Sequence, residues 1–138
     1  MQVQVRWDGD AQFVGTTESG HSVRMDGPPD AGGQDQGARP MEMVLLGLGG
    51  CSAFDVIHIL QRGRREVVGC EVRIDAERAT DDPKVFTRIH MQFVLRGDEL
   101  DRARVERAVA LSAEKYCSVA RMLASTATIT HAAELLPV

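Results

Sequence analysis

The sequence predicts one α+β domain over residues 1–138, with a one-sided sheet packed against a central helix. Three observations lead to this expectation. A long apolar segment, residues 41–60, is flanked on both sides by segments in which polar and apolar residues alternate. The length of 138 residues fits a single domain. The chain contains no internal repeat.

The N-terminal segment predicts a three-stranded antiparallel meander. Residues 2–7, 11–16 and 21–25 are the expected strands, separated by turns at residues 8–10 and 19–20. Residues 27–39 are rich in Gly, Pro and Asp, and we expect a mobile loop there.

Residues 40–63 predict the central helix, with Pro40 at its start and Gly63 at its end. Apolar residues occur on every side, so we expect this helix to be buried all round. A chain this short has too little material to enclose it, which predicts a homodimer whose second copy supplies part of the cover. Gly47, Gly49 and Gly50 each cost roughly 1 kcal/mol in a helix relative to alanine, which indicates that another backbone approaches closely.

The C-terminal half predicts two longer strands, two helices and a last strand. Residues 68–76 and 84–96 alternate, and the second strand should turn five apolar side chains inward: Val85, Ile89, Met91, Phe93 and Leu95. Asp98 is the expected cap of a helix over residues 100–116. The inner side of that helix should carry Val105, Ala108, Val109 and Ser112. Residues 117–118 interrupt it, residues 119–124 form a short helix and residues 127–136 a strand.

Composition narrows the function classes. The net charge of -4 is mild and argues against a nucleic-acid partner. The apolar segment is long enough to span a membrane, but Asp55, His58 and the glycines weaken that interpretation, so no membrane partner is expected. Three cysteines without a signal peptide predict a reducing, cytoplasmic setting.

The three cysteines occur in different contexts. Cys70 lies on the apolar face of a strand and is expected to be a small buried hydrophobe. Cys51 follows the glycines of the central helix. Cys117 lies at a helix break, beside Lys115 and four residues before Arg121. A helix N-terminus and nearby cations should lower the pKa of Cys117. The pattern gives a candidate nucleophile and a candidate partner, but no distance between them.

Cys51, Asp55 and His58 follow i, i+4, i+7 spacing and share a helical face. They could form a Cys-His nucleophile with an orienting carboxylate, or a metal site. The favoured interpretation is structural, with Asp55 and His58 satisfying each other or the neighbouring backbone in a buried helix. No metal site is therefore expected.

Two segments, PMEMVLLGLGGCSAFDV at residues 40–56 and LSAEKYCSVARML at residues 111–123, resemble the OsmC/Ohr family, most closely its YhfA-like branch. The resemblance also takes in SGHSVRMDG, CEVRIDAER and ITHAAEL, so it covers nearly the whole chain.

The resemblance implies an intertwined homodimer with antiparallel sheets around two long central helices. It also implies a thiol-dependent peroxidase. Cys51 would attack an organic hydroperoxide, Cys117 would resolve the product as a disulfide, and a dithiol reductant would restore both thiols. The substrate pocket would be apolar and lie at the subunit junction, and no cofactor would be needed.

The chain also departs from the family pattern. Family members carry a glutamate directly after the helix-opening proline and an arginine from the front of the chain, whereas here that glutamate position is Met41. Glu42 is about 180° around the helix from Cys51, since each residue turns about 100°. It could serve only if the helix breaks near residues 47–50, or if it serves the partner's site. The candidate arginines are Arg24 and Arg39.

Two alternatives to the peroxidase stay open. The protein could be a non-catalytic dimer of this family that binds an apolar ligand or acts as a redox-responsive protein. The cysteines could also merely fill space at a tight helix crossing.

Overall fold

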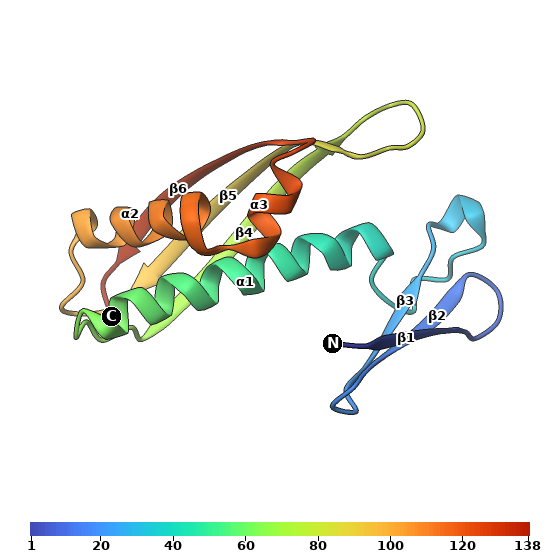
Figure 1. Cartoon of the computed structure of the whole chain (residues 1–138), viewed down its shortest axis with the longest axis horizontal. Coiled ribbons are helices and arrows are strands. Elements are labelled where there is room, and N and C mark those ends of the chain that lie inside the picture. Colours follow the sequence, from blue (N-terminus) through green and yellow to red (C-terminus); the bar gives the residue numbers. More distant parts are fainter. The chain divides into compact units, whose positions relative to one another are not determined.

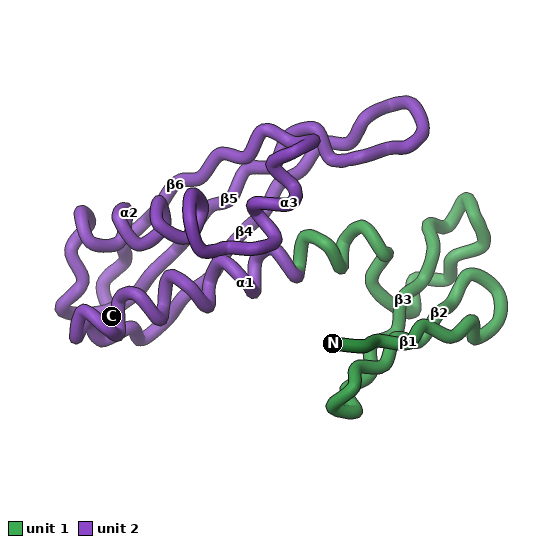
Figure 2. Tube along the Cα trace, viewed as in Figure 1, with its two compact units in different colours: residues 1–46 green, residues 47–138 purple.

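The computed structural model describes residues 1–138. The chain divides into two compact units, residues 1–46 and 47–138 (Figure 2). Helix α1 (Pro40–Arg62) begins in the first unit and ends in the second.

The first unit contains the expected meander. Strands β1 (Val3–Trp7), β2 (Gln12–Thr17) and β3 (Ser22–Asp26) form an antiparallel sheet in that order. Gly9 and Gly20 lie in the two turns with φ of 90° and 91°, which glycine adopts without a side-chain clash. Every residue of β1 is exposed, including the apolar Val3, Val5 and Trp7.

The segment expected to be a mobile loop is organised around a buried carboxylate. Asp26 accepts hydrogen bonds from the backbone N–H groups of Gly27, Gln34 and Gln36, at 2.8, 2.9 and 3.2 Å. A short 3₁₀ turn, Pro29–Ala31, lies within the same segment. A Cβ at Gly33 would overlap the Gly27 carbonyl oxygen, so this position requires glycine. The expectation of mobility rested on the polar composition alone. Composition does not show that one carboxylate binds three backbone N–H groups of this segment.

Within one chain, helix α1 is buried along one stripe only, and the expectation of burial all round, which included cover from a second copy, stays a prediction. The buried residues follow one another at intervals of four: Leu48, Ser52, Val56 and Leu60. Leu46 is 63% exposed and Phe54 69% exposed, and a Cβ at Gly47 or Gly50 would meet open space. The helix is long and apolar enough to cross a membrane by composition, but its buried stripe belongs to the core of the second unit.

The second unit contains a mixed sheet, with β4 (Gly69–Arg78), β5 (Phe86–Arg96) and β6 (Thr128–Leu136) in that order (Figure 1). Strands β4 and β5 are antiparallel, but β5 and β6 are parallel. The expectation of antiparallel sheets fails for this pair. Strand β6 runs parallel to β5 because the connection between them contains helices. This connection returns the chain to the end of the sheet where β5 begins, and β6 starts there.

That connection holds α2 (Arg102–Leu111), a π-helical turn (Ser112–Tyr116) and α3 (Ser118–Leu123). Asp101, not the expected Asp98, caps α2, because its carboxylate accepts the Arg104 backbone N–H at 2.9 Å. The expected inner side of this helix is confirmed, since Val105, Ala108, Val109 and Ser112 are all buried.

The core of the second unit lies between this helical layer and β5. Four of the five β5 side chains expected to face inward are buried, namely Ile89, Met91, Phe93 and Leu95, and Val85 is half-buried just before the strand. The sheet lies behind α2 in Figure 1. This packing fixes α2 and the π-helical turn that follows it, and Cys117 comes directly after that turn.

Candidate functional site

Two cysteines far apart in the sequence meet in the second unit. Cys51 is half-buried on α1, and Cys117 is 2% exposed at the start of α3. The sulfur atoms of both residues and a carboxylate oxygen of Asp55 all lie within 4.8 Å of one another. Both cysteines are free thiols.

The π-helical turn positions Cys117. The backbone N–H of Cys117 donates to the Ser112 carbonyl at 2.8 Å, which widens the last turn of the helix. Cys117 then adopts an extended backbone conformation and caps α3, where its sulfur accepts the Ala120 N–H at 3.4 Å. The sequence indicated a helix break here, but not its π-helical form.

Two buried serines support the cluster, and sequence reasoning assigned a site role to neither. The Ser52 hydroxyl donates to the Cys117 sulfur at 3.2 Å. The Ser112 hydroxyl donates to Asp55 Oδ2 at 3.0 Å. The available signal was small polar residues at inward-facing helix positions, where a buried hydroxyl needs a partner.

Burial raises the pKa of the Cys117 thiol, which contradicts the expected lowering. The hydrogen bonds from Ser52 and Ala120 oppose this shift in pKa, and the neighbouring Cys51 adds to it. Lys115 and Arg121, the cations expected to lower this pKa, interact with other groups. The Lys115 ammonium lies 5.2 Å from the Tyr116 ring centroid, and Arg121 donates to the Glu114 carbonyl at 3.5 Å.

Asp55 and His58 were expected to satisfy each other or the neighbouring backbone, but each has a side-chain partner elsewhere, so this part of the favoured interpretation was wrong. Asp55 accepts from Ser112 instead. His58 is exposed and stacks on Phe54 with ring centroids 5.9 Å apart. The cluster of possible metal ligands is therefore Cys51, Asp55 and Cys117, without the histidine.

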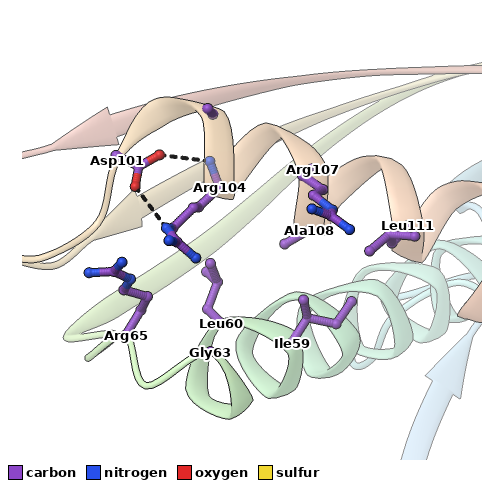
Figure 3. Close-up of a pocket in the computed structure, with 10 residues that line it drawn as sticks. Ile59, Leu60, Gly63, Arg65, Asp101, Arg104, Arg107, Ala108 and Leu111 are labelled. Carbon is purple, nitrogen blue, oxygen red and sulfur yellow. Dashed lines mark hydrogen bonds and ion pairs between the residues drawn. The ribbon is translucent and has the colours of Figure 1, made fainter.

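A pocket of about 280 Å³ is lined by Asp55 of this cluster and by neither cysteine. Its other lining residues are His58, Ile59, Arg62, Leu111 and Tyr116. A larger groove of about 620 Å³ continues along α1 and α2 and shares Ile59 and Leu111 with it (Figure 3). Three arginines line that groove, and one of them, Arg104, pairs with Asp101 at 3.1 Å (Figure 3).

The other candidate site residues from the sequence, Arg24, Arg39 and Glu42, belong to the first unit. Arg24 is exposed and pairs with Asp8 at 2.8 Å. Arg39 and Glu42 line a separate pocket of about 320 Å³, and the Glu42 carboxylate accepts the Arg39 backbone N–H at 2.9 Å. Helix α1 continues through residues 47–50, so the break that would let Glu42 serve its own chain's Cys51 is absent. Their catalytic roles stay predictions.

Cys70 lies on β4, opposite Leu95 of β5, and is half-buried rather than fully buried. Burial raises the pKa of its thiol. It is not part of the cluster of Cys51, Asp55 and Cys117.

Comparison with known proteins gives consistent matches. The family described as OsmC-like protein matches residues 33–132. Protein YhfA of Escherichia coli K12 is 49% identical over 136 residues, which cover 99% of this chain and 98% of YhfA. A hypothetical protein from Aquifex aeolicus VF5 is 29% identical with a TM-score of 0.81, over 98% of this chain and 96% of that one. The organic hydroperoxide resistance protein OhrB of Bacillus subtilis is 20% identical with a TM-score of 0.64, over 98% and 96% of the two chains, and shares the fold.

Proposed function

Because the chain belongs to the OsmC-like protein family, we propose that it is a thiol-dependent reductase of organic hydroperoxides. Cys51 is the attacking residue and Cys117 the resolving residue. The observation that carries this proposal is the separation of their sulfurs, which is within 4.8 Å. A disulfide needs about 2.05 Å between the sulfurs, a gap that side-chain rotation and small backbone shifts can close.

The reaction has three steps. The Cys51 thiolate attacks the distal peroxide oxygen, the O–O bond breaks, and the leaving alkoxide takes a proton to become an alcohol. The Cys117 sulfur then attacks the Cys51 sulfenic acid, and the displaced hydroxide leaves as water with the Cys117 thiol proton. An external dithiol supplies two electrons and two protons and restores both thiols.

The raised pKa of Cys117 suits its resolving role. A protonated thiol is a weak nucleophile toward peroxide, so the first attack is left to Cys51. The thiol proton of Cys117 also becomes available when hydroxide must leave.

The pocket next to Asp55 supports an organic rather than an inorganic peroxide. Ile59, Leu111 and Tyr116 give it apolar walls, and its volume of about 280 Å³ suits a small organic molecule. An apolar substituent there would leave its hydroperoxide group near the two sulfurs.

Homodimerisation is part of the proposal. Leu46, Phe54, Gly47 and Gly50 lie on α1 outside its buried stripe, and an exposed apolar face of this kind calls for a partner. A second copy of the chain would cover it. Glu42 and Arg39 would then act in the partner's site. One domain per chain and a cytoplasmic location, where thiols stay reduced, complete the proposal.

A non-catalytic dimer with an apolar ligand or a redox-responsive role is the second candidate. Met41 in place of glutamate favours it, because a partner carboxylate for the peroxidatic thiol is then missing from the expected position. Mass spectrometry after one equivalent of cumene hydroperoxide separates the two. A Cys51–Cys117 crosslink supports the reductase, and unmodified thiols support the second candidate.

The direct test is consumption of cumene hydroperoxide with a dithiol reductant. The intact protein should consume the hydroperoxide catalytically, and Cys51→Ser should be inactive. Cys70→Ser should consume it at the same rate as the intact protein. With Cys117→Ser, the reaction should stop after one equivalent per chain unless the reductant attacks the sulfenic acid directly. Undiminished turnover in Cys51→Ser would contradict the mechanism.

A further inference from the structure

We propose that the reduced protein binds one Zn²⁺ per chain, with the Cys51 and Cys117 sulfurs and an Asp55 carboxylate oxygen as its three protein ligands. This inference does not depend on peroxidase activity. It starts from the three ligand atoms, which all lie within 4.8 Å of one another.

The donor set and its spacing suit zinc. Zinc bonds cysteine sulfur at about 2.3 Å and carboxylate oxygen at about 2.0–2.2 Å, almost always in tetrahedral geometry. In a tetrahedron of those bond lengths, two sulfurs are about 3.8 Å apart and a sulfur and an oxygen about 3.5 Å. The observed separations need to close by at most about 1.0 Å between the sulfurs and about 1.3 Å between a sulfur and the oxygen, which is within the range of side-chain rotation.

Each of two ligands already has a hydrogen-bond partner that holds it. The Cys117 sulfur receives the Ser52 hydroxyl and the Ala120 N–H, and Asp55 receives the Ser112 hydroxyl. Hydrogen bonds of this kind orient the ligands of metal sites, and their loss typically lowers metal affinity by about 10–100-fold. Formation of the disulfide does not need the Asp55 carboxylate, whereas a metal site uses all three groups.

Charge favours a cation at this point. Binding replaces two thiol protons by one Zn²⁺, which offsets two of the three negative charges of the two thiolates and the carboxylate. Three protein ligands leave a fourth position for water, as in open zinc sites. Cys51 and Asp55 are half-buried, so a cation can reach the cluster from solvent.

Zinc binding and oxidation would then exclude each other. Forming the Cys51–Cys117 disulfide converts both thiolate ligands into a neutral bridge, and the metal is released. In the balanced step, one hydroperoxide and two protons convert the zinc dithiolate into disulfide, alcohol, water and free Zn²⁺. Bound zinc would also protect Cys51 from peroxide and alkylating agents.

The test uses the full chain, reduced and free of metal, without peroxide. Zinc sulfate is titrated in competition with a chromophoric chelator. We expect one Zn²⁺ per chain, and a loss of affinity of at least about tenfold in Cys51→Ser, Cys117→Ser and Asp55→Asn. Cys70→Ser, which removes a half-buried thiol outside the cluster, should bind as the intact protein does. Circular dichroism confirms that each variant is folded, with Cys117→Ala as a second variant at that position.

Cobalt gives an independent readout. Co²⁺ in place of zinc should produce thiolate-to-cobalt charge-transfer bands in the intact protein, and Cys117→Ser should weaken them. The proposal is overturned if the chelator strips zinc completely from the intact reduced protein, or if Cys117→Ser or Asp55→Asn keeps full affinity. Zinc binding without peroxide turnover would leave this site intact and remove only the proposed function.

Discussion

Replacing Ser52 by alanine tests how the fold tunes the resolving thiol. The Ser52 hydroxyl donates to the Cys117 sulfur at 3.2 Å, and both side chains are buried. A hydrogen bond to a charged group contributes about 1.5–3 kcal/mol, and about 1.4 kcal/mol is a factor of 10 at 25 °C. Taking the lower value for a sulfur acceptor, the variant should hold about tenfold less Cys117 thiolate at a given pH below the thiol pKa.

The assay is the rate of iodoacetamide alkylation of Cys117, measured against pH in a Cys51→Ser, Cys70→Ser background. We expect Ser52→Ala to lower that rate about tenfold at neutral pH and to move the midpoint of the pH profile upward. Ser112→Ala is the matched control, because it removes another buried hydroxyl that touches Asp55 and not the sulfur. Superimposable profiles for Ser52→Ala and its parent would refute the claim that this hydroxyl stabilises the thiolate.

Three further predictions concern stability and assembly. Leu48→Ala should lower the free energy of unfolding by about 2–5 kcal/mol in urea titrations, because Leu48 is completely buried. If the proposed dimer forms through this face of α1, Phe54→Glu should shift it to monomer in sedimentation velocity, and an unchanged dimer would place the interface elsewhere. The hydrogen bond from the Gln34 backbone N–H is the largest single cause of the lowered pKa of Asp26. Asp26 should thus stabilise the fold above pH 3.8 and lose this effect as the pH falls toward its lowered pKa. Asp26→Asn should therefore narrow the difference between urea midpoints at neutral and acid pH.

The regular elements could be predicted because local pattern determines them. Alternation located β5 and its inward residues, and Pro40 located the start of α1. The sequence does not reveal which strands pair, so the parallel arrangement of β5 and β6 had to come from the structure. The residue pattern does not predict how distant strands pair, because strand pairing depends on how the connections cross the sheet.

The site shows the same division. Cys51 and Cys117 stood out by context, and the resemblance to a known family suggested their pairing. The pKa of Cys117 was wrongly expected to be lowered, because burial outweighs the helix N-terminus and the nearby cations point elsewhere. Ser52 and Ser112 were missed as supporting residues, because a buried hydroxyl is recognised by its partner and not by its own position.

The parallel pairing of β5 with β6 affects the order in which the newly synthesised chain folds. Strands β4 and β5 can form a hairpin as soon as both have left the ribosome, whereas β6 follows β5 only after α2 and α3 have been synthesised. Until β6 arrives, one edge of β5 has no hydrogen-bonding partner, and an open edge of this kind can recruit other chains. The sheet is therefore complete only after the helical connection that carries Cys117 has been made.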